Sequence, residues 1–175
     1  YKAGAAKKVL IVCAEEPTRM TDWTDRRTCV LFGDGAGAAV LTEGDNIKGF
    51  SLSASSATDK LFQYRTLQPT PYITKEEHDM PLQMKGQDVF KFAVKASSSD
   101  ITKLLKAQGI SPDEVDHYLL HQANLRIIQT IVSFLDQPAE KFPVNIEDHG
   151  NSSSSCCPIL LDECNRSGRF KKGDK

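Results

Sequence analysis

The sequence has no hydrophobic run long enough to cross a membrane. Its longest apolar stretch, residues 9–14, falls far short of the about 20 residues that a membrane-spanning helix needs. Positive charge is not in excess either, because 22 Lys and Arg residues stand against 23 Asp and Glu residues, for a net charge of −1. A chain with so little net charge is poorly suited to neutralise the phosphates of a nucleic acid, which argues against nucleic acid as the main partner. These absences indicate a soluble globular protein with no membrane or nucleic-acid partner.

The sequence also lacks the cysteine spacing of a metal site or a disulfide framework. Its five cysteines are odd in number, and no two of them are separated by two residues. Cys156 and Cys157 are adjacent, which disfavours both chelation of one metal ion and a disulfide between them. No secretory signal is recognisable, so we expect reduced thiols, a cytoplasmic location and no metal site.

The length and composition of the chain are sufficient for a hydrophobic core. The chain has 175 residues, of which 39% are hydrophobic and 26% are charged, as in one domain or one half of a larger two-part fold. Its first residue is not Met, and it ends in Gly173-Asp174-Lys175, a turn signature that normally introduces another strand. We therefore expect this chain to be an internal piece of a longer protein.

Hydrophobic periodicity predicts strands that alternate with helices. Apolar and β-branched runs predict strands, the first of them buried on both faces, at residues 9–14, 28–31, 38–41, 47–53, 118–120 and 142–146. Apolar residues at helical spacing predict helices over residues 86–109, 124–135 and 153–166, with a helical turn at 111–114. Residues 54–81 are polar and form a long excursion between elements. This alternation predicts a layered α/β fold.

The string His121-Gln122-Ala123-Asn124 lies where a predicted strand meets a predicted helix. In open α/β sheets, ligands bind beyond the carboxyl ends of the strands, so His121 and Asn124 are expected to face a crevice. The alternative interpretation is that His121 only ends the strand and Asn124 only caps the helix.

A second polar string, Gly150-Asn151 followed by four serines, leads into the last predicted helix. An ordinary loop whose Asn or Ser side chain caps that helix would explain the string by itself. The pair formed by His121 and Asn151 says more, because a neutral imidazole and a carboxamide can both donate hydrogen bonds to one oxygen. Such a pair predicts a hole for a developing oxyanion or enolate, which suits thioester or carbonyl chemistry.

The glycine-rich residues 32–38 invite interpretation as a phosphate-binding loop. They lack the lysine of a Walker loop, and a strand-like run rather than a helix follows them. We interpret their small side chains as a means of packing strands tightly.

Four strings together resemble the condensing enzymes of the thiolase superfamily, and most closely the β-ketoacyl-acyl-carrier-protein synthase III family. They occur in the family order, at residues 22–38 (DWTDRRTCVLFGDGAGA), 86–94 (GQDVFKFAV), 121–128 (HQANLRII) and 150–153 (GNSS). The first looks like the opening of the family's second half, the second like its acyl-channel helix, and the last two like its catalytic stretches. The resemblance implies a thiolase-like layered αβαβα fold, present here mainly as its C-terminal half without the closing strands.

The resemblance implies a catalytic role for two residues. His121 and Asn151 match the histidine and asparagine of the family's Cys-His-Asn triad, which assist decarboxylation of a malonyl thioester and stabilise the carbanion. The family's nucleophilic cysteine lies on a helix upstream of the stretch that matches residues 1–8, so none of the five cysteines here is assigned as nucleophile. Cys156 stands where the family usually has serine, and Ser154 and Ser155 replace its paired alanines.

Other residues match positions that bind the substrate or its carrier. Arg26, Gly86, Phe90 and Asn124 match positions that line the tunnel for coenzyme A and its pantetheine arm. Arg126 matches the basic position at the tunnel mouth that docks the acidic carrier protein, and a cation there would steer an acidic partner. By the same resemblance, residues 1–27 are the end of the N-terminal half and its linking loop, and residues 28–175 are an incomplete C-terminal half.

The resemblance implies an acyltransferase of type II fatty acid synthesis, inactive as this piece alone. The parent enzyme would condense a short acyl group, taken from coenzyme A, with malonyl-acyl-carrier protein and release a 3-oxoacyl product. No cofactor is expected, since the coenzyme A thioester is a substrate, and the full-length protein is expected to be a homodimer. Two alternatives stay open: another synthase of the superfamily, of secondary metabolism or of the hydroxymethylglutaryl type, or an inactive half that binds only coenzyme A or a partner.

Overall fold

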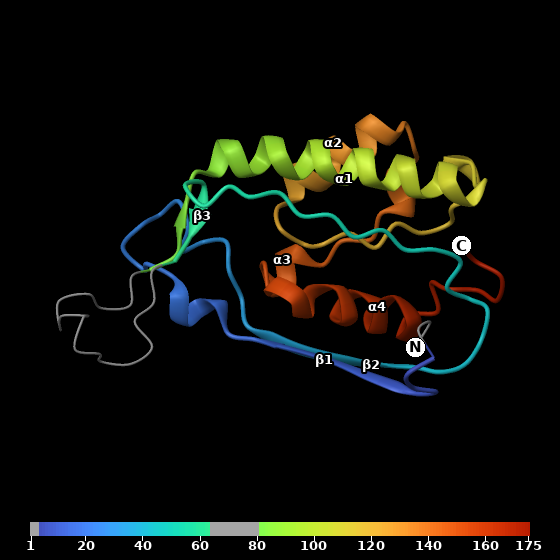
Figure 1. Cartoon of the computed structure of the whole chain (residues 1–175). Coiled ribbons are helices and arrows are strands. Elements are labelled where there is room, and N and C mark those ends of the chain that lie inside the picture. The colour runs from blue at the N-terminus through green and yellow to red at the C-terminus, as the bar shows by residue number, and fades with distance from the viewer. Residues whose placement is uncertain (1–3, 64–80) are drawn as a thin grey trace.

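The computed structural model describes residues 4–63 and 81–175 (Figure 1). In these residues strand β1 (Val9–Glu15) pairs with β2 (Gly35–Leu41), and β3 (Leu61–Phe62) pairs with β4 (Gln83–Met84). The α-helices are α1 (Gly86–Gln108), α2 (Leu125–Leu135), α3 (Ile146–His149) and α4 (Cys156–Arg166). Short 3-10 helices are η1 (Pro17–Met20), η2 (Pro112–Glu114), η3 (Ala139–Lys141) and η4 (Ser153–Ser155).

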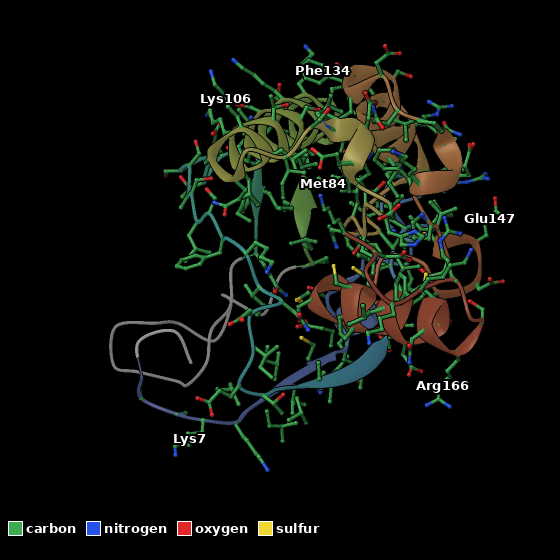
Figure 2. The ribbon with its side chains drawn as sticks, turned by 90° about the vertical axis from the view of Figure 1, so that its right-hand side faces the viewer. Lys7, Met84, Lys106, Phe134, Glu147 and Arg166 are labelled. Atoms are coloured by element: carbon green, nitrogen blue, oxygen red, sulfur yellow. The ribbon has the colours of Figure 1, made fainter. Side chains whose placement is uncertain are left out.

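The elements lie in layers, as the predicted α/β fold requires. In Figure 1 the β1–β2 ribbon runs along the bottom, α4 lies above it, and α1 and α2 form the top layer. Helix α4 contacts β2, and α1 contacts α2. Figure 2 shows the same layers from the side, with Lys106 and Phe134 on the upper helices and Arg166 on α4 pointing outward. None of the helices in the described part of the chain is long and apolar enough to span a membrane.

The β1–β2 pair is covered on one face only. Its strands run antiparallel over their full length, and the small residues of β2 let α4 approach closely. A methyl group added to Gly37 would lie 2.8 Å from Cγ of Pro158. On the other face Leu10 is 65% exposed and Val12 is 63% exposed. The prediction that residues 9–14 are buried on both faces is therefore wrong, because within the described residues only the α4 side of the pair is packed.

The long helices begin and end where the sequence predicts. Gly109 ends α1 in the left-handed conformation, with φ 66°, and its N–H donates to the carbonyl of Leu105. Asn124 caps α2 by accepting a hydrogen bond of 2.9 Å from the N–H of Arg126. The apolar faces of these helices share one buried core, to which each fully buried aliphatic side chain contributes about 1.5–3 kcal/mol. Its buried members are Val115, Tyr118, Ile127, Ile128, Ile131, Leu135 and Phe142.

Several predicted strands are absent from the described residues. Residues 28–31 lie in turns, while 47–53, 118–120 and 142–145 have no regular structure, and Ile146 begins α3. A strand needs a neighbour along its length. Between segments 118–120 and 142–146 no ladder forms, and the nearest backbone link is one bond of 2.8 Å from Tyr118 N–H to the carbonyl of Lys141.

The predicted helix over residues 153–166 is confirmed as η4 followed by α4, with Gly168 beyond its end at φ 72°. The excursion predicted for residues 54–81 falls largely outside the described residues. The predicted boundary between residues 27 and 28 lies in the loop between β1 and β2, and it stays a prediction.

Candidate active site

The first candidate residue, His121, lies just before α2 and is exposed to solvent. Its Nδ1 atom is 2.8 Å from Sγ of Cys156, the first residue of α4. Within residues 4–63 and 81–175, Nε2 of the same ring has no hydrogen-bond partner. The protein therefore holds the imidazole through one nitrogen and leaves the other available to a ligand.

The second candidate residue, Asn151, is fixed by its backbone. Its N–H donates to the carbonyl of Leu31 at 2.8 Å, and its own carbonyl accepts from Gly33 N–H at 3.2 Å. The preceding Gly150 has φ 64° and ψ −164°, a conformation that glycine alone adopts readily. The side-chain oxygen Oδ1 accepts a bond of 3.0 Å from Ser153 N–H. With Oδ1 engaged in this way, the Nδ2 amide is left as a donor, and no residue in the described part of the chain accepts a hydrogen bond from it.

The glycine-rich string, residues 32–38, leads into β2 and packs against this turn. A methyl group on Gly35 would lie 3.0 Å from Oγ of Ser155, and 2.9 Å from Cδ1 of Ile159 on α4. The string therefore provides the predicted close packing: its residues 35–38 pair with β1, and α4 with its entry turn packs against them.

The two candidate residues meet the same short stretch of chain. Asn151 stands in the turn that leads through η4 into α4, and His121 contacts Cys156, where α4 begins. No hydrogen bond among the described residues joins the two side chains to each other. Ser155 stiffens the connecting turn, since its buried hydroxyl donates to the carbonyl of Ser152 at 2.7 Å.

Cys156 stands at the centre of this arrangement, and the sequence interpretation had set it aside. It is 2% exposed, and its Sγ also accepts a bond of 3.3 Å from the N–H of Gln122 and lies 3.8 Å from Sγ of Cys157. The Cys157 thiol, the His121 ring and the Gln122 amide together lower the pKa of Cys156 to about 4, although burial alone would raise it. The same contact and burial raise the pKa of Cys157 above its usual range. The signal in the sequence was the position of Cys156 at a helix start.

Gln122 holds the backbone that carries His121. Its side chain is fully buried, its Nε2 donates to the carbonyl of Leu120 at 2.9 Å, and its Oε1 accepts from Asn145 N–H at 3.2 Å. A buried carboxamide with both ends satisfied fixes the segments that it joins. Gln122 is not among the site residues predicted from the sequence.

Two family models match this chain. The model described as 3-Oxoacyl-[acyl-carrier-protein (ACP)] synthase III C terminal matches residues 105–175, and the model described as 3-Oxoacyl-[acyl-carrier-protein (ACP)] synthase III matches residues 1–59. The β-ketoacyl-[acyl-carrier-protein] synthase III of Xanthomonas campestris is 44% identical over 174 residues, covering 98% of this chain and 54% of the relative. The enzyme of the same name from Helicobacter pylori is 39% identical over 179 residues, covering 99% of this chain and 54% of the relative.

The chain belongs to the 3-oxoacyl-acyl-carrier-protein synthase III family. It spans about half the length of the curated relatives that it matches. The solved synthase III from Thermus thermophilus superposes with a TM-score of 0.85 at 37% identity, covering 99% of this chain and 55% of that chain. The Aquifex aeolicus enzyme superposes with a TM-score of 0.84 at 36% identity, covering 99% and 53%. The predicted thiolase-like α/β fold is thus confirmed.

The other residues that the synthase III resemblance singled out lie on separate elements. Arg26 is exposed in the turns before β2, Gly86 is the first residue of α1, and Phe90 on α1 packs partly against the shared core. Asn124 caps α2, and Arg126 is exposed two residues further on. No hydrogen bond within the described residues joins any of the five to His121 or Asn151. Their substrate-binding and docking roles stay predictions.

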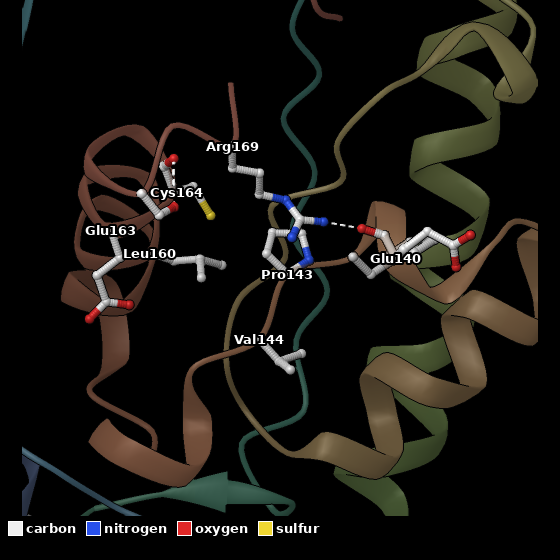
Figure 3. Close-up of a pocket in the computed structure, with 9 residues that line it drawn as sticks. Glu140, Pro143, Val144, Leu160, Glu163, Cys164 and Arg169 are labelled. Atoms are coloured by element: carbon white, nitrogen blue, oxygen red, sulfur yellow. Dashed lines mark hydrogen bonds between the residues drawn. The ribbon is translucent and has the colours of Figure 1, made fainter. Parts of the chain in front are cut away.

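A hollow of about 440 Å³ lies elsewhere in the molecule (Figure 3). It opens between η3 and α4, and Arg169 donates a hydrogen bond across it to the backbone carbonyl of Glu140. None of the predicted site residues lines it, so we do not assign it to the synthase chemistry. In the same described residues, no three metal-binding side chains come together.

Proposed function

We propose that this chain supplies the histidine and asparagine of a decarboxylative condensing site in type II fatty acid synthesis. The observation that carries the proposal is how the two side chains are held. Nδ1 of His121 is engaged by Cys156, and Oδ1 of Asn151 is engaged by Ser153. The nitrogen that remains on each side chain is one that can donate a hydrogen bond. Two neutral donors that reach one oxygen stabilise an enolate better than water does.

In the proposed reaction, the thioester oxygen of the malonyl group accepts hydrogen bonds from Nε2 of His121 and Nδ2 of Asn151. The bond between the malonyl α-carbon and its carboxylate breaks, carbon dioxide leaves, and the electron pair stays on the acetyl thioester as its enolate. The α-carbon then attacks an acyl group held as a thioester on a cysteine, whose thiolate leaves. The product is a 3-oxoacyl thioester. By the family resemblance, that cysteine is not one of the five in this chain.

We propose further that Arg26, Gly86, Phe90 and Asn124 line the path of the coenzyme A thioester. The exposed guanidinium of Arg26 suits a phosphate, and the open surface at Gly86 leaves room for a narrow pantetheine arm. Coenzyme A enters this scheme as a substrate, so the chemistry is assigned to protein side chains without a cofactor.

We propose that the carrier protein docks at the exposed start of α2. Arg126 is exposed there, and no ion pair within the described residues occupies its guanidinium. An exposed cation of this kind steers an acidic partner and affects the rate of association more than the lifetime of the complex. We also propose that the full-length protein is a cytoplasmic homodimer, with acyl-coenzyme A and malonyl-acyl-carrier protein as its substrates.

A related activity is the priming step of a polyketide pathway. The priming β-ketosynthase of the R1128 polyketide pathway superposes on this chain with a TM-score of 0.84 at 30% identity. The curated relatives named above are more similar and carry the name β-ketoacyl-[acyl-carrier-protein] synthase III, so they favour the first proposal. Acyl-donor profiling with acetyl, branched and longer thioesters would separate the two, since both use the same histidine and asparagine.

A chimera tests the proposal directly. The matching 174 residues of the Xanthomonas campestris enzyme are replaced with this chain, so that the rest of that enzyme supplies the missing part. We expect carbon dioxide release from malonyl-acyl-carrier protein. His121→Ala and Asn151→Ala should each lower this rate by roughly a hundredfold or more, because each removes one donor to the enolate.

Matched substitutions control for loss of folding. His117→Ala removes a histidine whose ring pairs with Asp174, away from the candidate site, and Asn165→Ala removes an exposed asparagine on α4. Both should leave decarboxylation within about twofold of the unsubstituted chimera, because neither side chain contacts His121 or Asn151. A chimera that keeps full decarboxylation without His121 and Asn151 would overturn the proposed function.

A further inference from the structure

Cys156 and His121 share one proton site. The 2.8 Å contact joins Sγ to Nδ1, so a single hydrogen lies between them, carried either by the sulfur as a thiol or by the ring nitrogen. Two hydrogens cannot both fit in that gap. When the sulfur and the ring together hold two protons, and any thiol hydrogen points at Nδ1 rather than at Sγ of Cys157, the second proton lies on Nε2.

This arrangement decides whether Nε2, the free nitrogen of the His121 ring, carries a hydrogen. If the thiol donates to Nδ1, the ring is neutral with a hydrogen on Nε2; if the thiolate accepts from Nδ1, the ring is a cation that also has a hydrogen on Nε2. A backbone carbonyl beside Nδ1 would do the opposite for a neutral ring, because it can only accept and would leave Nε2 bare. For a neutral ring, a residue that donates to Nδ1 is thus needed beside it.

We propose that Cys156 is the positioning residue that keeps a hydrogen on Nε2 of His121, so that this nitrogen donates to the substrate oxygen. The inference rests on the proposed function for its consequence in catalysis. The structural part of the inference rests on three observations: the 2.8 Å contact between Sγ of Cys156 and Nδ1 of His121, the burial of Cys156, and the free Nε2 of the exposed His121 ring.

The surroundings of the sulfur support this role. The N–H of Gln122 donates to Sγ at 3.3 Å, which holds the sulfur in place against the ring and favours the thiolate form of the pair. Cys157 is the other titratable side chain that contacts Sγ in the described residues, and Cys13 on β1 influences Cys157 in turn. These neighbours set the charge of the pair. The hydrogen on Nε2 is kept while the sulfur and the ring together hold two protons, whereas a thiolate beside a neutral ring would place the hydrogen on Nδ1 and leave Nε2 bare.

The first test reads the proton on His121 without using activity. Nitrogen NMR of the imidazole, in the full chain and in the chimera, distinguishes a protonated from a bare Nε2. We expect a protonated Nε2 at neutral pH in the unsubstituted protein and in Cys156→Ser, because a hydroxyl can also donate to Nδ1. Cys156→Ala should give a mixture of the two neutral tautomers. A bare Nε2 in the unsubstituted protein would overturn the proposal, whatever the variants do.

The second test separates positioning from packing. In the chimera, Cys156→Ala should lower kcat for decarboxylation by roughly tenfold to a hundredfold with KM nearly unchanged, as for the loss of groups that orient a reacting side chain. Cys156→Ser should restore most of that loss. The matched control is Cys164→Ala, which removes another buried thiol of α4 that does not contact His121. An equal loss of kcat in Cys156→Ala and Cys164→Ala would overturn the proposal.

The two readouts also separate this inference from the proposed function. If decarboxylation proves independent of His121, the proposed function fails while the tautomer measurement still decides the role of Cys156 in holding the ring. If decarboxylation depends on His121 but Cys156→Ala keeps both the tautomer and kcat, the proposed function stands and the role of Cys156 is excluded.

Discussion

The α-carbon of Gly33 lies so close to the backbone carbonyl of His149 that a methyl group added to it would stand 2.0 Å from the oxygen. No side chain can fit there without moving the backbone. Because Gly33 N–H also donates to the carbonyl of Asn151, any such movement displaces the turn that holds Asn151. The close approach therefore links the glycine-rich string to the geometry of the candidate site.

We expect Gly33→Ala to lower the free energy of unfolding by roughly 1–3 kcal/mol, as overpacking of a close contact does. Urea denaturation of the chimera measures the change. The control is Gly44→Ala, where the added methyl would meet no atom within 4 Å. Equal stability of the two variants would contradict the close approach of Gly33.

A buried hydroxyl weakens α1. Ser98 is fully buried, and its Oγ has no hydrogen-bond partner among the described residues. Ser98→Ala should raise the free energy of unfolding by about 1 kcal/mol or more, since it removes an unpaired polar atom and improves helix propensity. Ser99→Ala, at a half-buried neighbouring position, should bring only the smaller propensity gain. Chemical denaturation of both variants checks this, and a loss of stability in Ser98→Ala would show that its hydroxyl has a partner.

The carboxylate of Glu163 ties α4 to the residues around α3. It accepts from Asn145 Nδ2 at 2.7 Å and contacts Nε2 of His149 at 2.6 Å. A double-mutant cycle between His149→Ala and Glu163→Ala should give a coupling of about 0.5–1 kcal/mol that declines with added salt, because both side chains are partly exposed. The exposed pair of Arg166 and Asp162 on α4 serves as the control and should couple less strongly. A coupling near zero would mean that Glu163 acts on Asn145 alone.

The low pKa of Cys156 makes the stability of the protein depend on pH in a particular direction. The folded protein holds the group with a pKa of about 4, against an ordinary thiol value of 9.0, so between these values the unfolded chain binds more protons. This stabilising contribution is complete above about pH 9 and is lost as the pH falls through the window to 4. Cys156→Ser should flatten the pH dependence of unfolding across this range, and unchanged curves would contradict the low pKa.

Thiolate absorbance tests the cause of that low pKa. The contact with Cys157 is the largest favourable influence, so Cys157→Ala should raise the pKa of Cys156. Burial raises the pKa of Cys164, which makes Cys164→Ala a suitable control that leaves the acidic titration in place. Titration of Cys156 at the same pH in both variants would assign its ionisation to His121 and Gln122 instead.

The helices could be predicted because the residues at each helix end determine where the helix begins or stops. Gly109 ends α1 by a left-handed backbone, and Asn124 starts α2 by accepting from a backbone amide two residues away. Neither signal depends on any distant part of the chain. Strands differ, because their hydrogen bonds lie across to other segments, and residues 47–53 and 118–120 have no such partner strand in the described part.

The site was predictable to the extent that residue type decides chemistry. The hypothesis that His121 and Asn151 act as a pair came from residue type, because a neutral imidazole and an amide can both donate to one oxyanion, and it stays a prediction. The contact between His121 and Cys156 could not be predicted from the sequence, because it joins residues that are 35 positions apart. A cysteine in place of the family's serine is a small change in sequence, and its importance follows only from the position of the sulfur beside the ring. Gln122 was missed for the same reason, because a buried glutamine has no signature in sequence.

The side chain of Gln122 bridges two stretches of backbone that share no ladder, one ending at His121 and one reaching Asn145. Its amide N–H meanwhile reaches the sulfur at the start of α4. Three separate segments thus converge on a single position, and none can shift without straining the others. Grafting either loop of the candidate site from a homologue should therefore succeed only when Gln122, Asn145 and Cys156 are exchanged as one set.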